Sequence, residues 1–465
     1  MTTAKNTKDM TKGSPWKLIV TFAIPIFLSN LFQTLYNTFD SFVVGRFIGD
    51  DALAAVSSSG NLIFLFTSFF VGMFAGAGTV IANYFGKKDQ ENMSKAIHTD
   101  VAIALVSSVV LTIAGVLLTP YILEAMGTAP EVLPNSIEYF RWYFFGISGT
   151  IMYNCLNSIL QAVGNSRRGL YYLIVASIIN VALDLLFIAG FGWGVWSAAF
   201  ATSISQVVSA LLCFGFLTKP KEIYTISLKK IRFHKDMVKS ILRFGVPSGI
   251  QNSVIGLANV LVQTNINSFG NKAMADCGSY SKLEGFAFLP ITCFSLSIST
   301  FISQNLGAKE YERAKKGATF SIITSLIMSE VIGVIMYFGC PIFISWFAND
   351  PEAVAYGVQQ ARTMSLFYFA LSFSHCVSAI CRGGGKPVIP MLVMLLDWCV
   401  IRVAYITIVM NINHEIGLLF WAYPITWGIS SIFYFFYLIF SDWVHGFDKI
   451  EEKKRLKEQK ENGLQ

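Results

Sequence analysis

The sequence predicts an all-α polytopic membrane protein, with twelve transmembrane helices arranged as two pseudo-symmetric six-helix lobes. Three observations support this fold class. The 465-residue chain is 54% hydrophobic and only 14% charged, whereas soluble domains carry about 25% charged residues. Its apolar residues form long stretches separated by short polar segments. The second half of the chain also repeats motifs of the first half at a nearly constant distance.

Twelve apolar stretches are long enough to cross a bilayer. The predicted spans are 16–44, 52–82, 94–120, 134–163, 168–190, 193–218, 238–269, 273–304, 314–340, 353–381, 387–411 and 414–441. The N-terminus is polar and leads directly into the first span, so we expect no cleavable signal peptide.

Lysine and arginine alternate between the loops and so predict the orientation. The N-terminal tail, the central loop, the even-numbered loops and the C-terminal tail hold 28 of them, and the opposite side holds four. Since positive residues are retained in the cytoplasm, both termini and the central loop are predicted to be cytoplasmic. We therefore expect a multi-pass protein of the cell (plasma) membrane, whose net charge of +7 requires no nucleic-acid partner.

The chain is an internal repeat. The segment IANYFGKKDQENMSKA aligns with ISQNLGAKEYERAKKG, with Gly86 on Gly307 at an offset of 221, and Pro25 aligns with Pro247 at an offset of 222. Six spans in each half give both repeats the same orientation, so substrate is expected between two lobes that rock against each other. The predicted domains are an N-terminal lobe (1–218), a cytoplasmic linker (219–237), a C-terminal lobe (238–441) and a cytoplasmic tail (442–465).

The first span carries a polar stripe. Asn30, Gln33, Asn37 and Asp40 recur at spacings of three and four and therefore share one helix face. A membrane-embedded carboxylate costs several kcal/mol unless it is solvated, paired or protonated, so the stripe should face a bundle interior or a wet cavity. Pro25 removes one helical hydrogen bond and favours a kink. These features indicate an ion-coupled transporter; the alternative is a structural polar seam between helices.

The fifth and sixth spans supply partners for Asp40. Asn180 and Asp184 are four residues apart and share a helix face, and Thr202 adds a hydroxyl. Two carboxylates, an amide oxygen and a hydroxyl suit a shared proton or a hard cation such as Na+. We predict an ion-coupling site at these four residues, with no cofactor and no other metal. For Asp184, a purely structural interhelical hydrogen bond is the alternative.

The second half lacks these carboxylates. At an offset of 222, Asp40 falls on Val262, and at 221, Asp184 falls on Tyr405. The ion site is therefore expected in the N-terminal lobe alone.

Three other embedded ionisable residues have roles that the sequence leaves open. Glu284 could pair with Lys282 or Arg243, which favours a structural role over transport, and Asp397 and Arg402 are candidates to support the C-terminal lobe. No enzyme motif is present: GGGK at 383–386 lacks both the first glycine and the final Ser or Thr of a P-loop. We therefore do not expect an enzyme.

Five segments give the chain a family resemblance: PIFLSNLFQTLYNTFDSFVVGR, ALAAVSSSGN, ILQAVGNSRRG, INVALDLLFIAGFGWGVWSAAFAT and ISQNLGAKEYERA. With them, the chain resembles the multidrug and toxic compound extrusion (MATE) family across all twelve spans, in the branch of DNA-damage-inducible-type and archaeal members. The resemblance implies export of amphipathic, often cationic drugs in exchange for H+ or Na+ by alternating access. Asp40, Asn180, Asp184 and Thr202 match the cation-site pattern of that branch.

Polar and large side chains of the first lobe are candidates for lining the substrate cavity: Gln33, Tyr36, Asn37, Met152 and Asn157. We expect a monomer. The alternative function on the same scaffold is a flippase for a lipid-linked precursor, but a flippase needs a basic cavity for phosphate, and the spans contain few basic residues.

Overall fold

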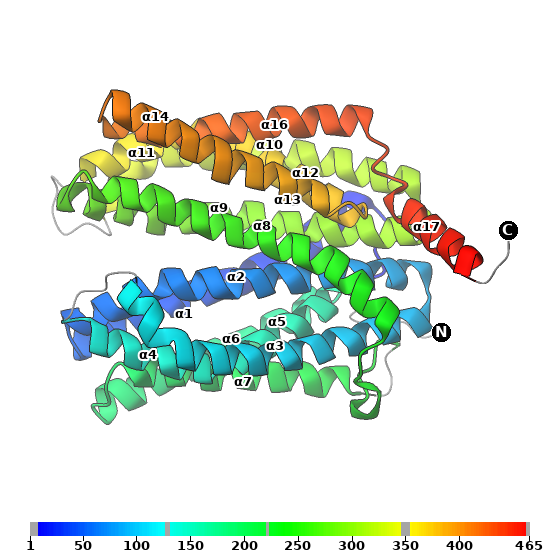
Figure 1. The fold of residues 1–465 in the computed structure, drawn as a ribbon, viewed down its shortest axis with the longest axis horizontal. Helices are drawn as coiled ribbons and strands as arrows, with labels where there is room; N and C mark the ends of the chain where they lie inside the picture. The colour runs from blue at the N-terminus through cyan, green and yellow to red at the C-terminus, as the bar shows by residue number, and fades with distance from the viewer. Residues whose placement is uncertain (1–7, 126–130, 220–222, 346–353, 462–465) are drawn as a thin grey trace. The chain divides into compact units, whose positions relative to one another are not determined.

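The computed structural model describes residues 8–125, 131–219, 223–345 and 354–461, and every regular element within these ranges is a helix (Figure 1). The helices of the first half are α1 (Pro15–Phe47), α2 (Asp50–Lys87), α3 (Gln90–Ala125), α4 (Leu133–Phe145), α5 (Ile147–Ala162), α6 (Ser166–Asp184), the π-helix η1 (Leu185–Gly190), α7 (Trp196–Leu217) and the 3-10 turn η2 (Leu228–Lys230).

The second half follows the same order. Its helices are α8 (Lys235–Asn267), α9 (Asn271–Gly307), α10 (Tyr311–Ser345), α11 (Ala355–Ser365), α12 (Tyr368–Gly383), α13 (Val388–Met394), the π-helix η4 (Leu395–Ile401), α14 (Arg402–Ile412), α15 (Ile416–Phe420), α16 (Ala422–Phe440) and α17 (Gly446–Glu461).

Each of the twelve predicted spans coincides with one helix or with consecutive helices of this order. Within the described residues, nine helices are long and apolar enough to cross a membrane, or ten if α11 and α12, which meet at 57°, form one broken span. The all-α, polytopic fold class is confirmed. Gly146 separates α4 from α5, and the π-helices η1 and η4 interrupt two further spans, which hydropathy does not register.

The chain forms two compact units, unit 1 (Met1–Asp9 and Ile24–Gly249) and unit 2 (Met10–Ala23 and Ile250–Gln465). One unit boundary lies before α1, between Asp9 and Met10; the other two fall inside α1, beside Pro25, and inside α8, close to Pro247. The predicted lobes, in contrast, are separated by the linker 219–237.

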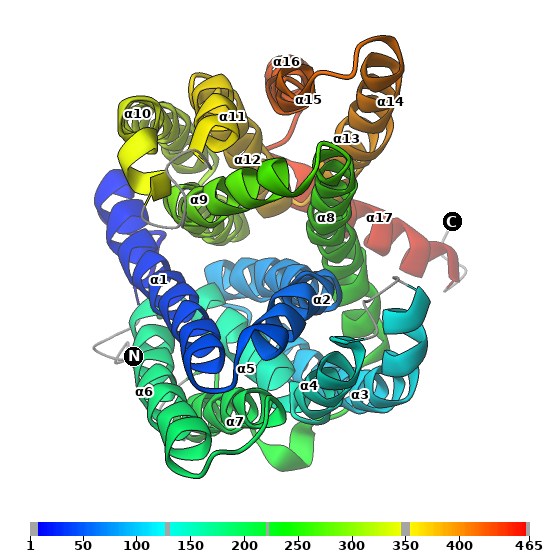
Figure 2. The ribbon, with the colours of Figure 1, turned by 90° about the vertical axis from the view of Figure 1, so that its left-hand side faces the viewer.

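The two units repeat one packing scheme (Figures 1 and 2). In unit 1, α5 packs against α2, α3 and α7; in unit 2, the corresponding α12 packs against α9, α10 and α16. The repeat extends to single turns. Lys88 and Lys309, 221 residues apart, end α2 and α9 with the same left-handed backbone, at φ 58° and 61°, a conformation that non-glycine residues adopt only rarely.

A glycine pair allows α2 and the first part of α8 to cross closely within unit 1. Gly72 and Gly76 form a GxxxG motif, and a Cβ at either position would collide with the carbonyl oxygen of Ser248 or Phe244. GxxxG spacing lets helix backbones approach in this way inside membranes. Gly76 therefore has little room for any side chain.

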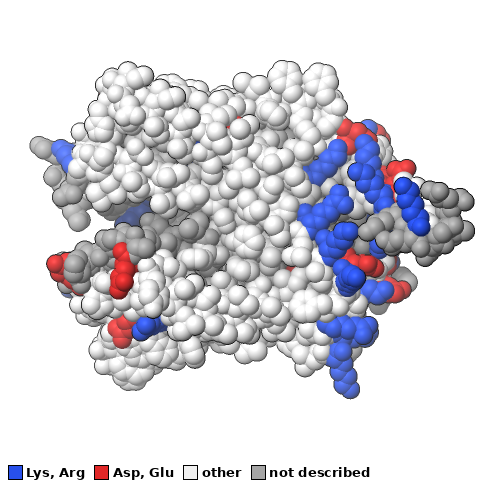
Figure 3. Space-filling model, in the orientation of Figure 1, with Lys and Arg blue, Asp and Glu red and all other residues white. Residues whose placement is uncertain are grey.

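Exposed side chains indicate which helices meet lipid. The outer faces of α3 and α10 are lined by large aliphatic or aromatic residues: Leu105, Val106, Val109, Val110, Ile113, Leu117 and Leu118 on α3, and Ile323, Ile327, Val331, Val334, Ile335, Phe338 and Ile342 on α10. On the face drawn in Figure 3, the middles of the long helices carry almost no charged side chains, and Lys and Arg gather at helix ends. Such surfaces are suited to the hydrocarbon core of a bilayer.

A small group of charged side chains links the start of the C-terminal helix α17 to the residue Asp442, which follows α16 by two positions. Asp442 accepts hydrogen bonds from Lys449 Nζ (2.8 Å) and pairs with His445 Nδ1 (2.7 Å). Lys449 and His445 together lower the pKa of the Asp442 carboxyl below its ordinary value. These pairs lie within the predicted cytoplasmic tail; its contacts to the rest of unit 2 include Tyr311 Oη, which donates to Asp448 Oδ2 (3.0 Å), and Lys386 Nζ, which donates to the Asp442 carbonyl (2.7 Å).

Candidate functional site

The four predicted ion-site residues come together inside unit 1 from three helices. Asp40 lies in the last third of α1, Asn180 and Asp184 lie at the end of α6, and Thr202 lies near the start of α7. Asp40 is 7% exposed, and Asn180 and Asp184 are 0% exposed. The i, i+4 spacing of Asn180 and Asp184 places both on the α6 face that packs against α7.

A short chain of hydrogen bonds links the helices. Asn180 Nδ2 donates to Thr202 Oγ1 (3.3 Å), and Thr202 Oγ1 donates to Asp40 Oδ2 (3.2 Å). Thr202 therefore holds Asp40 and Asn180 in a fixed arrangement, with its single hydroxyl proton directed at the carboxylate.

The remaining oxygens of the site are acceptors without donors. Among the described residues, no N–H or O–H group reaches Asp40 Oδ1, Asn180 Oδ1 or either carboxylate oxygen of Asp184. A buried acceptor that lacks a donor costs about 1–3 kcal/mol. Four such oxygens in one buried cluster form a site that a positive species would satisfy.

The two carboxyl groups are direct neighbours. Asp40 and Asp184 lie within hydrogen-bonding reach of each other, and two ionised carboxylates repel. Either one proton shared between the pair or a cation bridging both groups removes that repulsion. The π-helix η1 begins immediately after Asp184, and π-turns inside α-helices are frequent at functional sites.

The sequence analysis missed two neighbours of this site. Tyr139 of α4 is buried and lies close enough to interact electrostatically with Asp40 and Asp184. Gln206 of α7 donates through Nε2 to the hydroxyl oxygen of Tyr36 (2.8 Å). Gln206 follows Thr202 by four residues, a spacing that could have identified it; no comparable signal marks Tyr139.

The predicted cavity residues have diverse surroundings. Tyr36 is buried next to Asp40, Gln33 is half-buried and Asn37 is exposed on α1. Met152 packs against the main apolar core of unit 1. Asn157 packs against the backbone of α6 at Gly169, where a Cβ would collide with its Oδ1 atom. Of these side chains, Tyr36 is the one that interacts directly with Asp40.

The equivalent place in unit 2 is apolar. At the repeat offsets, Asp40 corresponds to Val262, Asp184 to Tyr405 and Thr202 to Tyr423. Val262 belongs to an apolar cluster against which both tyrosines pack. Within the described residues, the buried carboxylate pair is thus a feature of unit 1.

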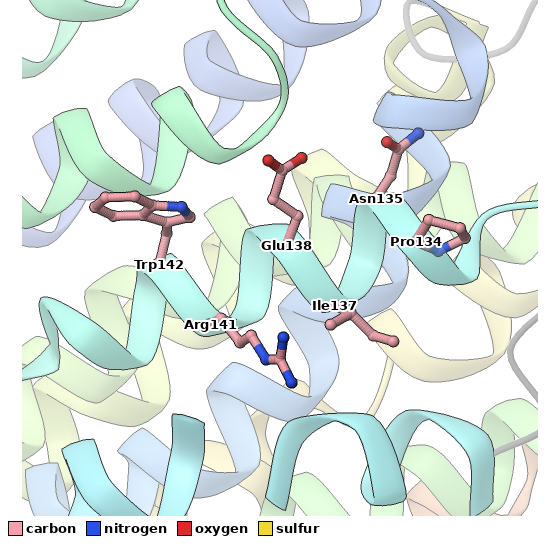
Figure 4. A pocket seen from close by; sticks show the side chains of 6 residues that line it. All are labelled: Pro134, Asn135, Ile137, Glu138, Arg141 and Trp142. Carbon is pink, nitrogen blue, oxygen red and sulfur yellow. The ribbon is translucent and has the colours of Figure 1, made fainter. Parts of the chain in front are cut away.

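A separate surface hollow of about 490 Å³ lies along one helix. Figure 4 shows its lining, which comes entirely from α4: Pro134, Asn135, Ile137, Glu138, Arg141 and Trp142. Asn135 and Glu138 project from one side of the helix and Arg141 from the other (Figure 4). The hollow shares no residue with the Asp40 site, so it adds nothing to the cation cluster.

The fold and this site can be compared with known proteins. The family model MatE matches residues 25–186 and 247–408. The two matches start 222 residues apart and cover both halves, which confirms the internal repeat.

Known relatives match most of the chain. The probable multidrug resistance protein YoeA of Bacillus subtilis (strain 168) is 28% identical over 397 residues, covering 84% of this chain and 86% of that protein. The FAD transporter of Shewanella oneidensis is 23% identical over 346 residues, covering 73% of this chain and 75% of that protein.

Solved structures have the same fold. One, described as the outward-facing conformation of a multidrug resistance MATE family transporter of the MOP superfamily, superposes with a TM-score of 0.87 at 22% identity, covering 98% of this chain and all of that chain. This likeness confirms the predicted fold of twelve membrane helices in two six-helix lobes.

Proposed function

Because the chain belongs to the MatE family, whose members are membrane transporters and not enzymes, we propose that it is a secondary antiporter that exports amphipathic, often cationic compounds in exchange for H+ or Na+. Relatives named as multidrug resistance and multidrug export proteins support this cargo class. The proposal places the protein in the plasma membrane as a monomer with both termini in the cytoplasm.

The buried acceptor cluster of unit 1 carries this proposal. Asp40, Asn180 and Asp184 present four oxygens without donors, and Thr202 fixes two of these residues. A proton on the carboxylate pair, or Na+ among the oxygens, supplies the missing positive charge.

Coupling requires that the ion and the cargo favour different states of the transporter. Asp40 lies on α1, the helix that also contains Pro25 and the unit boundary beside it. Loading the ion site would change the packing of α1 and thereby the affinity for cargo. A coupling free energy of about 1–3 kcal/mol, roughly 5–150-fold in affinity, is sufficient.

The experiment is transport of ethidium by purified protein in liposomes, driven by an imposed pH gradient or by an imposed Na+ gradient. The wild-type protein is expected to move ethidium under one of the two gradients, and Asp40→Asn to abolish that movement. Transport by wild type that ignores both gradients, or an Asp40→Asn protein with unchanged gradient dependence, would contradict the proposed mechanism.

A further inference from the structure

Unit 2 contains its own cluster of charged side chains within the apolar spans. Glu284 lies on α9, and Asp397 and Arg402 lie at η4 and the start of α14. Glu284 and Asp397 both interact electrostatically with Arg402. Within the described part of the chain, no acidic group comes within ion-pair distance of Arg402, and neither Lys282 nor Arg243 forms an ion pair with Glu284. The structure thus pairs Glu284 with Tyr280, and not with Lys282 or Arg243 as the sequence suggested.

Arg402 is an internal countercharge. It is 1% exposed, its Nη2 donates to Thr426 Oγ1 (2.7 Å), and its guanidinium carbon lies 4.2 Å from the ring centre of Trp398 and 4.6 Å from that of Tyr423. Its backbone N–H bonds to the carbonyl of Asp397 across the π-helix. This π-turn brings together two residues that are five positions apart, which an ordinary α-helix would place on different faces.

Glu284 is the accessible member of the cluster. It is half-buried, whereas Asp397 is 2% exposed. Tyr280 donates its hydroxyl to Glu284 Oε1 (3.0 Å), and the hydroxyls of Tyr280 and Tyr368 lie 3.1 Å apart. Tyr368 in turn packs edge-on against Phe288. The carboxylate is thus held in place on one side and bordered by aromatic rings.

The face of α9 that carries Glu284 is unlike a lipid-facing surface. Met274 is the one large apolar side chain exposed along the described part of α9, whereas α10 exposes seven. Ser281, Lys282 and Gly285 are exposed instead, and a Cβ at Gly285 would meet nothing within 4 Å. A small and polar surface with open space indicates that this side of α9 faces water.

The cluster has no counterpart in unit 1. At the offset of 221, Glu284 corresponds to Ile63, Asp397 to Ala176 and Arg402 to Val181. The charges are therefore not required by the repeated scaffold. Two carboxylates against one guanidinium leave the cluster one negative charge in excess when all three groups are ionised. Arg402 and Asp397 are both buried, so Glu284 is the group that solvent can reach.

We propose that Glu284 forms a second binding site, in unit 2, for the positively charged group of an organic cation, with the neighbouring aromatic side chains contacting its apolar part. A carboxylate beside aromatic rings matches both parts of such a molecule, since ring faces also attract cations. This inference rests on the proposed export of cationic compounds and adds where unit 2 recognises them.

The test uses equilibrium binding of tetraphenylphosphonium, a permanent organic cation, to the full-length protein in detergent. Glu284→Gln keeps the shape and the acceptor for Tyr280 but removes the charge, and should weaken binding about tenfold or more. The matched control is Glu330→Gln, which changes another half-buried glutamate of unit 2 whose Oε1 accepts from the Phe369 N–H (3.2 Å); its affinity should stay that of wild type. Tetraphenylborate, of the same shape and opposite charge, should bind Glu284→Gln at least as well as wild type. Equal weakening of both probes, or no weakening of either, would overturn the inference.

A second measurement does not depend on removing Glu284. Gly285→Cys places a thiol in open space, whereas the native cysteines are buried or half-buried. A saturating concentration of tetraphenylphosphonium should slow the reaction of the introduced thiol with a polar maleimide at least about threefold. In the double variant Glu284→Gln/Gly285→Cys, tetraphenylphosphonium should no longer slow the maleimide reaction. If saturating tetraphenylphosphonium does not slow the reaction of Gly285→Cys, the proposed binding site at Glu284 is contradicted. If wild type transports ethidium under a gradient but Glu284→Gln binds tetraphenylphosphonium as tightly as wild type, the binding site at Glu284 is overturned and the proposed transport function stands. Failure of wild type to bind the probe at all would overturn the inference together with the proposed cationic cargo.

Discussion

Changing Asp184 to asparagine should make the protein more stable and, at the same time, uncouple it. Both carboxylate oxygens of Asp184 are buried without a donor, as is Asp40 Oδ1. Asp184→Asn keeps the size of the side chain, removes one negative charge and introduces an N–H group that can donate to Asp40. Relief of one unsatisfied buried acceptor contributes about 1–3 kcal/mol, so the ion-free variant should resist unfolding by that amount more than ion-free wild type.

The assay is thermal unfolding in detergent at neutral pH, with and without saturating Na+. If Na+ is the coupling ion, wild type should gain about 2.7 kcal/mol at a Na+ concentration 100 times its Kd, whereas Asp184→Asn should gain nothing. If the ion is H+, Na+ should leave both proteins unchanged, and uptake of ethidium into liposomes should respond to a pH gradient in wild type only.

A matched control separates this effect from a general tolerance of buried asparagine. Asp100 of α3 is also 0% exposed with an oxygen that lacks a donor, but its other oxygen accepts from Cys155 Sγ (3.5 Å), outside the ion site. Asp100→Asn should keep gradient-driven transport. An Asp184→Asn protein that unfolds more easily than wild type and still transports ethidium with the full response to the gradient would refute this prediction.

Three further predictions concern packing, pH and orientation. Gly76→Leu should destabilise unit 1 by more than about 2 kcal/mol, because the α2–α8 crossing has no space for the side chain; Gly215→Ala, in open space on α7, should be neutral in the same unfolding assay. Asp442→Asn should raise amide exchange in α17, by an amount equivalent to less than about 1 kcal/mol because the pair is exposed. Since the folded-state pKa of Asp442 is lowered, its contribution is present above the ordinary carboxyl pKa of about 4 and is lost as the pH falls through the folded value, so the difference from wild type should shrink below about pH 4. A cysteine at Glu415 should react with an impermeant thiol reagent outside intact cells and one at Lys229 should not, and reversed labelling would exclude cytoplasmic termini.

The clustering of Asp40, Asn180, Asp184 and Thr202 could be predicted because it depends largely on local spacing. Asn180 and Asp184 share a face whatever the helix packs against, and depth along the span places them level with Asp40. Tyr139 could not be predicted, since the inward face of α4 is decided by its packing against α3 and α7. Asn157 was proposed as a cavity residue, but a polar side chain can equally pack against a glycine of the next helix, here Gly169.

The charged cluster of unit 2 escaped prediction for a different reason. Asp397 and Arg402, five residues apart, do not share a face in an α-helix, and only the π-helix η4 brings them together. The sequence contains no recognised signal for such a turn. The chemistry of Glu284 likewise depends on Tyr280, one turn away, and on Tyr368, which follows the break between α11 and α12.

The two units therefore share one scaffold and differ in where their buried charges lie. At the repeat offsets, Asp40 and Asp184 correspond to Val262 and Tyr405 of unit 2, and Glu284 and Arg402 correspond to Ile63 and Val181 of unit 1. Buried charges are costly in a membrane protein. The repeat counterparts of these four charged residues are Ile, Val and Tyr, so the helices can pack without the charges, and stabilising the helices is not enough to explain them. Reciprocal placement instead allows each unit to bind a different positive species without competition at a single carboxylate. Under the proposed exchange, ion and cargo at separate carboxylates would be coupled through the states that each favours, and not only by displacing each other from one shared group.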